Sequence, residues 1–240
     1  MVSINLGSFL GTVNAVNNRI KRLNPLQMLR NFVISVEARW FDWRHNVKTR
    51  ADQSENLRDW NYSFPYLPIR PPTARRLVRS LPVGNYSDYT FIDIGSGKGR
   101  MLLLASEFPF RKIVGVEMRQ DLHDRALENV RRFRRPRVKC SQIECRLEDA
   151  TRYDFPAGKL IVYLFNPFSA EVAREVLRRL DDSVEQHPRE IVLVYLYPEF
   201  GSLMKTMRNF QMVEETGLHF IARSQFDGVQ DPRARYTCAQ

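Results

Sequence analysis

The pattern of apolar and polar positions along the chain changes near residue 84. From there, short aliphatic runs alternate with stretches in which apolar residues recur every three or four positions. The runs predict buried strands over 89–94, 112–116, 138–144, 159–165 and 190–195, and the other stretches predict helices over 97–107, 120–133, 170–180 and 201–209. Two final strands are expected over 210–215 and 218–226. Such alternation is typical of a doubly wound α/β fold, here with seven strands, mostly parallel.

Residues 1–83 follow a different pattern and are predicted to form a helical extension ahead of the domain 84–240. An amphipathic helix is expected over 24–47, where the recurring residues are Leu26, Leu29, Phe32, Val33, Val36, Trp40 and Trp43. This helix would pack over the domain as a lid, or lie on a membrane surface through its aromatic residues and flanking basic residues. The proline- and aromatic-rich segment 60–73 predicts an ordered loop, followed by a second helix that ends at residue 81.

Charge and the length of the apolar runs bear on possible partners and on localisation. The formal net charge is +10, from 37 Lys and Arg against 27 Asp and Glu. The densest run, Arg131 to Arg137, could bind phosphates of nucleic acid or lipid, although a solvated helix end explains it more simply. No apolar run reaches the roughly 18 residues that a membrane span needs, and the start lacks the features of a secretory signal. We therefore expect a cytoplasmic protein without a transmembrane span.

The histidines and cysteines show no pattern that would bind a metal. The 3 cysteines lack CxxC spacing, so we expect reduced thiols and no metal site. His123 and His187 have no partner arrangement and are expected at the surface.

A glycine-rich turn follows the first predicted strand. Asp93 is followed by Gly95, Ser96, Gly97 and Gly99, and the helical pattern begins immediately afterwards. Glycines in a strand-to-helix turn permit a close backbone approach by a ligand. The spacing is GxGxG rather than the GxGxxG of dinucleotide-binding folds.

This motif resembles the first motif of class I S-adenosylmethionine-dependent methyltransferases, an acidic residue followed by GxGxG. The resemblance implies a sheet with strand order 3-2-1-4-5-7-6 and S-adenosyl-L-methionine as cofactor. It also implies that Asp93 positions the methionine part, partly through water, and that Gly95, Ser96, Gly97 and Gly99 line the cofactor.

Two further acidic positions follow the next strands. Glu117, with Met118 beside it, ends the second strand, where a carboxylate can accept hydrogen bonds from ribose hydroxyls. Asp149 is similar to the family residue that contacts the adenine amino group. Glu148 is the adjacent alternative, and a turn cap is the structural one.

The fourth strand runs into Asn166-Pro167-Phe168 at the same edge of the sheet. This tripeptide looks like a shortened form of the Asn/Asp-Pro-Pro-Tyr/Phe motif of amino-directed methyltransferases. The resemblance implies that Asn166 orients a target nitrogen, that the Pro167 carbonyl accepts from it and that Phe168 forms a wall. The missing second proline argues against a planar adenine or amide acceptor. Tyr195 and Tyr197 could add a hydroxyl or an aromatic cage, or could be core and surface residues.

A second resemblance concerns the loop ahead of the domain. Tyr66 and Pro68 are similar to the Tyr-x-Pro loop of Rossmann-type lysine methyltransferases, whose glycine motif matches residues 93–100 and is related to that of Dot-type enzymes. It implies that Tyr66 and Pro68 close over the cofactor. We expect methyl transfer to a nitrogen, with a protein lysine as candidate acceptor. A nucleic-acid or small-molecule acceptor is the second hypothesis. A non-catalytic cofactor-binding module, or one docked to a membrane or partner, is the third.

Overall fold

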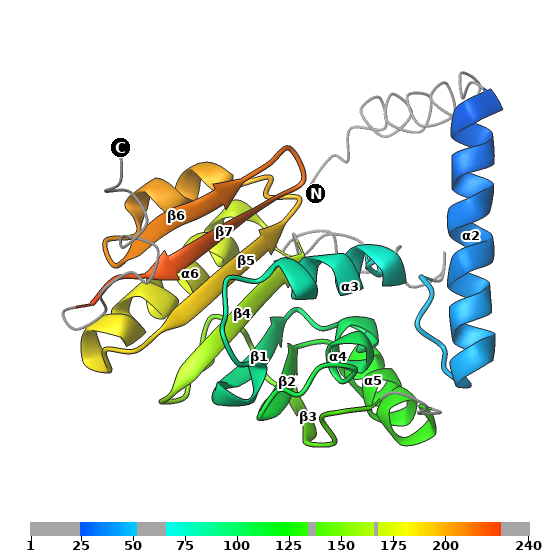
Figure 1. The fold of residues 1–240 in the computed structure, drawn as a ribbon, viewed down its shortest axis with the longest axis horizontal. Coiled ribbons are helices and arrows are strands. Elements are labelled where there is room, and N and C mark those ends of the chain that lie inside the picture. Colours follow the sequence, from blue (N-terminus) through cyan, green and yellow to red (C-terminus); the bar gives the residue numbers. More distant parts are fainter. Residues whose placement is uncertain (1–24, 52–65, 134–137, 166–167, 227–240) are drawn as a thin grey trace, which may run out of the picture.

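The fold is a seven-stranded sheet covered by helices on both faces (Figure 1). A computed structural model describes residues 25–51, 66–133, 138–165 and 168–226. The strand order is β3-β2-β1-β4-β5-β7-β6, as predicted. The strands are β1 (Tyr89–Ile94), β2 (Lys112–Glu117), β3 (Ile143–Leu147), β4 (Lys159–Phe165), β5 (Ile191–Leu196), β6 (Phe210–Glu215) and β7 (His219–Ser224).

Strands β1 to β5 run parallel, and β7 pairs antiparallel with both β5 and β6. The helices are α2 (Pro25–His45), α3 (Pro71–Ser80), α4 (Arg100–Ala105), α5 (Gln120–Arg132) and α6 (Ala170–Gln186), with short 3-10 helices at Tyr86–Asp88 and Gly201–Thr206. One apolar layer joins α3, α4 and the end of α2 to the sheet. The other joins α6 and the second 3-10 helix to the opposite face. The parallel strands therefore have both faces buried, which explains their nearly uninterrupted aliphatic sequences.

The third strand lies later in the sequence than predicted, at Ile143–Leu147 instead of 138–144. The N–H groups of Lys139 and Cys140 both donate to the carbonyl of Ser106, at 2.8 and 3.1 Å, so this stretch crosses the end of α4 before pairing begins. The expected helix over 201–209 is a 3-10 helix that ends at Thr206. Helix α4 begins only at Arg100, because Gly97 and Gly99 belong to the turn.

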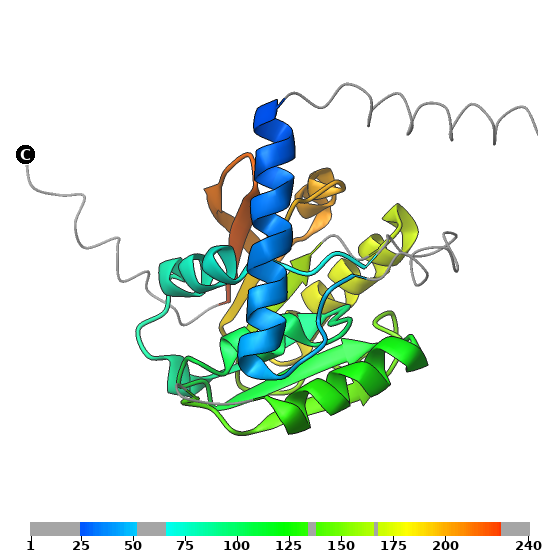
Figure 2. The ribbon, with the colours of Figure 1, turned by 90° about the vertical axis from the view of Figure 1, so that its right-hand side faces the viewer.

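Helix α2 stands beside the α/β body, and its C-terminal end lies nearest to the sheet (Figures 1 and 2). Phe41 and Val47 belong to the same apolar layer as Phe91 of β1, so this end of α2 is part of the core. Within the described ranges, no helix combines the length and the apolar character needed to cross a membrane. The division at residue 83 stays a prediction.

Candidate functional site

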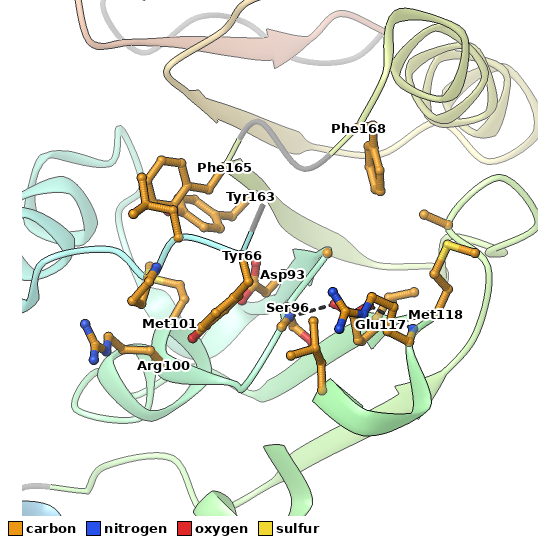
Figure 3. A pocket seen from close by; sticks show the side chains of 18 of the residues that line it. Tyr66, Asp93, Ser96, Arg100, Met101, Glu117, Met118, Tyr163, Phe165 and Phe168 are labelled. Carbon is orange, nitrogen blue, oxygen red and sulfur yellow. Dashed lines mark hydrogen bonds between the residues drawn. The ribbon is translucent and has the colours of Figure 1, made fainter. Parts of the chain in front are cut away.

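A cavity of about 620 Å³ opens at the carboxyl ends of β1, β2 and β4 (Figure 3). This is the edge at which open α/β sheets bind ligands. Its lining includes every described cofactor-site residue predicted from the sequence except Gly99; these lining residues are Tyr66, Asp93, Gly95, Ser96, Gly97, Glu117, Met118, Glu148 and Asp149. The predicted residues are therefore brought together around one space.

The glycine turn is hydrogen-bonded to the end of β2. The N–H groups of Gly95 and Ser96 both donate to the carbonyl of Val116, at 2.9 and 3.0 Å. Gly95, Gly97 and Gly99 have φ values of 78°, 53° and 79°, a left-handed region that L side chains rarely adopt. Gly99 takes this conformation as the residue immediately before α4. It closes the turn without lining the cavity.

Gly97 also lies directly against the ring of Tyr66. A Cβ atom at Gly97 would be 2.3 Å from Cε2 of Tyr66, closer than any real contact. The backbone at Gly97 and the ring of Tyr66 therefore form two adjoining walls of the cavity.

Glu117 ends β2 with its carboxylate held in place by two backbone groups. Its Oε2 accepts from the N–H of Gly97 at 2.8 Å, and its Oε1 accepts from the N–H of Arg119 at 2.9 Å. Burial raises the pKa of this carboxyl, while these two hydrogen bonds favour its charged form. Each oxygen keeps a further lone pair, so a diol in the cavity can donate to both.

Asp93 lies deeper, in β1, and only 3% of its surface is exposed. Burial, together with the nearby charge of Glu117, raises the pKa of Asp93 to about 8. A cation placed beside Asp93 would stabilise its ionised form. This end of the cavity is therefore suited to a positively charged group.

Tyr163 is a cavity residue that the sequence argument did not identify. It pairs with Asp93 in the β1–β4 register, and its ring stacks on Phe91. Its hydroxyl is buried and has no hydrogen-bond partner among the described residues. A buried polar group is normally bonded, so this hydroxyl is available to a ligand. The available signal was a lone tyrosine inside an otherwise apolar strand.

Asp149 and Glu148 line the cavity beyond Glu117. Oδ1 of Asp149 accepts from the N–H and the hydroxyl of Thr151, at 2.9 and 2.8 Å, so Asp149 does cap a turn. No described residue bonds its Oδ2. Capping and ligand binding are thus compatible roles for the same carboxylate.

The end of α2 supports Tyr66 through a buried network that we name the Asp42 brace, made of Asp42, Thr49 and Arg100. The Thr49 hydroxyl donates to Oδ1 of Asp42 at 2.6 Å and accepts from Nε of Arg100 at 2.6 Å. The Thr49 carbonyl accepts from the Tyr66 hydroxyl at 2.9 Å. The brace therefore links α2, the first residue of α4 and the ring over Gly97.

Asn129 of α5 binds the backbone next to the brace, at Lys48 before Thr49 and at Lys98 in the glycine turn. Its Oδ1 accepts from the N–H of Lys48 at 2.7 Å, and its Nδ2 donates to the carbonyls of Lys48 and Lys98, at 3.1 and 2.9 Å. Sequence reasoning missed both the brace and Asn129, because Arg100 and Thr49 are 51 residues apart and the partners of Asn129 are 31 and 81 residues away, separations that leave no periodic signal.

The predicted reacting end is described only in part. Asn166 and Pro167 lie outside the described residues. Phe168 is buried and lines the cavity together with Phe165 and Tyr197, whose rings are 5.5 Å apart. Tyr195 is fully buried against Phe220, which resolves its alternatives in favour of a core role.

The two histidines differ in their surroundings. His187 is exposed, as expected, whereas His123 is buried, because it lies on the inner side of α5 beside Leu122 and Ala126. Within the described ranges, no cluster of three His, Cys, Asp or Glu side chains is placed to hold a metal ion.

The sequence matches no protein-family model, and no curated protein is significantly similar to it. Among solved structures, the chain is similar to a ribosomal protein L11 methylase from Lactobacillus delbrueckii subsp. bulgaricus, with 14% identity over 70% of this chain and 83% of that one and a TM-score of 0.45. It is also similar to an RNA methyltransferase from Salinibacter ruber in complex with S-adenosyl-L-homocysteine, with 19% identity, coverage of 66% and 92%, and a TM-score of 0.44. For TrmN from Thermus thermophilus the identity is 18%, the coverage 65% and 49%, and the TM-score 0.47. These likenesses do not bear on the chemistry of this chain, whose fold is established by its own strand order.

Proposed function

We propose that this chain is an S-adenosylmethionine-dependent methyltransferase. The observation that carries the proposal is the Glu117 carboxylate, which the N–H groups of Gly97 and Arg119 hold at the edge of the glycine turn. A nucleoside lying on that turn would present its ribose hydroxyls to two fixed acceptor oxygens. Asp149 or Glu148 would then meet the adenine amino group, and Asp93 the methionine part.

The charges around the cavity favour this cofactor over a dinucleotide. Among the described residues, four acidic side chains line it: Asp93, Glu117, Glu148 and Asp149. The two arginines that line it in the described part of the chain are engaged elsewhere, since Arg100 belongs to the Asp42 brace and Arg119 pairs with Asp121. A pyrophosphate would meet mainly repulsion here, whereas a sulfonium and an ammonium group would be attracted.

Bound S-adenosylmethionine would supply a methyl group activated by its positive sulfur. Transfer is an in-line displacement, so the main task of the protein is alignment of the acceptor and exclusion of water. Glu117 and the glycine turn would fix the nucleoside, Tyr66 would cover it, and Phe165 and Phe168 would shield the methyl group. Asp93 would hold the charged amino-acid end.

For the acceptor, we propose a nitrogen, with a protein lysine as the first candidate. The support is the Tyr66-x-Pro68 loop, placed against the glycine turn, and the aromatic rings of Phe165, Phe168 and Tyr197 along the cavity. Aromatic walls can accommodate an amine and its methylated products. A nucleic-acid acceptor is the second candidate, because the sequence carries the arginine run that begins at Arg131.

The cofactor is tested by calorimetric titration with S-adenosylhomocysteine. We expect binding to the wild type and a loss of about tenfold to a hundredfold in affinity for Glu117→Gln, since two charge-assisted hydrogen bonds are weakened. Glu215→Gln is the matched control, because Glu215 is exposed on β6. Undetectable binding by the wild type, or equal binding by both Glu117→Gln and Glu215→Gln, would reject the proposal.

The acceptor is tested by incubating cell extract with tritiated S-adenosylmethionine and the protein, then separating protein, nucleic acid and small molecules. Label in a protein band that yields methylated lysine on hydrolysis supports the first candidate. Label in nucleic acid replaces it with the second. We expect Asn166→Ala to abolish labelling while S-adenosylhomocysteine still binds, as the shortened Asn-Pro-Phe motif implies.

A further inference from the structure

Helix α2 presents an aromatic and aliphatic face to solvent, which we name the α2 aromatic face. Its members are Phe32, Val33, Val36, Trp40 and Trp43, and the exposed fractions of the two tryptophans are 56% and 77%. At about 100° per residue, these five side chains share roughly a third of the helix circumference. They extend over 11 intervals, or about 17 Å of helix.

This face is distinct from the side of α2 that packs on the body. Phe41, Asp42 and His45 are buried and point to the core, where Phe41 packs beside Arg100 and His45 beside Phe133. Packing on the protein therefore already satisfies one side of the helix. The exposed aromatic residues need a separate explanation, because isolated exposed apolar residues are common but a continuous stripe is not.

The charges on α2 indicate what covers the stripe. Arg39 and Arg44 are exposed, flank the aromatic face on its two sides, and have no acidic partner among the described residues. The acidic residues of the helix are withdrawn from this face, since Glu37 pairs with Arg70 at 2.8 Å and Asp42 lies inside the brace. The solvent-facing side of α2 is thus apolar in the middle and only positive at its borders.

We propose that the α2 aromatic face is a docking surface for an anionic phospholipid bilayer. Tryptophan rings are enriched at the boundary between headgroups and acyl chains, and the two valines and the phenylalanine can enter the acyl region. Arg39 and Arg44 would meet the negative headgroups. A polynucleotide would use the arginines and the tryptophan rings but would leave the aliphatic members in water. The helix would lie on the membrane and not cross it.

The position of α2 ties this surface to the cavity. The Asp42 brace is at the anchored end of the same helix and reaches Tyr66 through Thr49. Figure 2 shows the length of α2 lying across the front of the body, so docking would hold the α/β body against the bilayer. We then expect the methyl acceptor to lie at or near the membrane surface. This expectation rests on the proposed function, whereas the docking proposal does not depend on it.

The test is vesicle flotation of the full chain with phosphatidylcholine vesicles that contain or lack phosphatidylglycerol. We expect flotation with the anionic vesicles and at least a tenfold lower partition coefficient for Trp40→Gln/Trp43→Gln, because two exposed aromatic anchors are removed. Arg39→Gln/Arg44→Gln should weaken binding to anionic vesicles severalfold and leave the weak binding to neutral vesicles unchanged. Met212→Gln/Leu218→Gln is the matched control, since both residues are exposed on the β6–β7 hairpin, which Figure 1 shows on the other side of the body from α2.

Circular dichroism and S-adenosylhomocysteine binding confirm that each variant is folded, so that failed docking and failed cofactor binding are told apart. The proposal is overturned if the wild type stays unbound, or if the tryptophan variant floats as well as the hairpin control. It is also overturned if the wild type is a dimer, the tryptophan variant is a monomer, and neither protein binds vesicles. Displacement from anionic vesicles by equimolar RNA in the wild type, but not in the arginine variant, would assign the face to nucleic acid instead.

Discussion

Asp93 makes the strength of cofactor binding depend on pH. Its carboxyl lies in β1 with 3% of its surface exposed, and burial with the charge of Glu117 raises its pKa to about 8. Near neutral pH, Asp93 therefore holds a proton most of the time. S-adenosylmethionine carries an ammonium and a sulfonium group, and its methionine part should bind best when Asp93 is ionised.

The size of the effect follows from the fraction of ionised Asp93. With a pKa of about 8, that fraction is about 1% at pH 6 and about 10% at pH 7. Because the apparent Kd is the intrinsic Kd divided by the binding-competent fraction, Kd should fall about tenfold between these two pH values. Binding should also release about one proton, which gives a heat that depends on the buffer.

The assay is isothermal titration of the wild type with S-adenosylmethionine between about pH 6 and 7.5, in two buffers of different ionisation enthalpy. Asp93→Asn keeps the shape of the side chain and should bind weakly with a nearly flat pH profile. Asp88→Asn is the control, since Asp88 is exposed one residue before β1, and it should retain the wild-type slope. A flat profile in the wild type, with no proton released, would refute the role given to Asp93.

Three further predictions concern stability and the glycine turn. The pKa of Asp93 is about 8 in the folded protein and about 3.9 in the unfolded chain. Between these two pH values the folded state keeps a proton that the unfolded state has lost, so the free energy of unfolding falls as pH rises. Asp93→Asn should therefore melt at a higher temperature than the wild type at about pH 8, and a lower or equal Tm would contradict this. Gly97→Ala places a Cβ 2.3 Å from a ring atom at a φ of +53° and should reduce S-adenosylhomocysteine affinity about a hundredfold or more, whereas Gly84→Ala, with nothing within 4 Å, should match the wild type. Asp42→Ala leaves buried Arg100 without its carboxylate and should lower the urea-unfolding free energy by about 3 kcal/mol; a loss below about 1 kcal/mol would show that the brace is not stabilising.

The central part of the fold and of the site was predictable because its signals are local. Asp93, the three glycines and the helical pattern after them lie within a dozen consecutive residues, and a left-handed turn leaves glycine as its mark. Glu117 follows in the same way, as the last residue of an aliphatic strand. Each of these positions is determined by the geometry of its own segment.

The third strand was misplaced because its sequence lacks an apolar run. In β3, Glu144 and Arg146 are charged, Glu144 pairs with both Arg146 and Lys112, and the strand is only half-buried at the edge of the sheet. In the stretch before it, the N–H groups of Lys139 and Cys140 donate instead to the carbonyl of Ser106. Partners outside the strand decided where pairing begins.

The Asp42 brace and the position of the Tyr163 hydroxyl in the cavity depend on contacts between distant segments. Arg100 and Asp42 are 58 residues apart, and neither residue type is unusual on a helix. Tyr163 reads as one more core residue of β4 until the register places it beside Asp93. Such features come from tertiary packing, which hydrophobic periodicity does not encode.

A crystal structure of the full chain with S-adenosylhomocysteine would test the proposed cofactor site directly. We expect both ribose hydroxyls within hydrogen-bond distance of the Glu117 carboxylate, with the nucleoside lying on Gly95 to Gly97 beneath the ring of Tyr66. A complex in which the ligand sits elsewhere, or in which Glu117 contacts only the N–H groups of Gly97 and Arg119, would contradict this expectation.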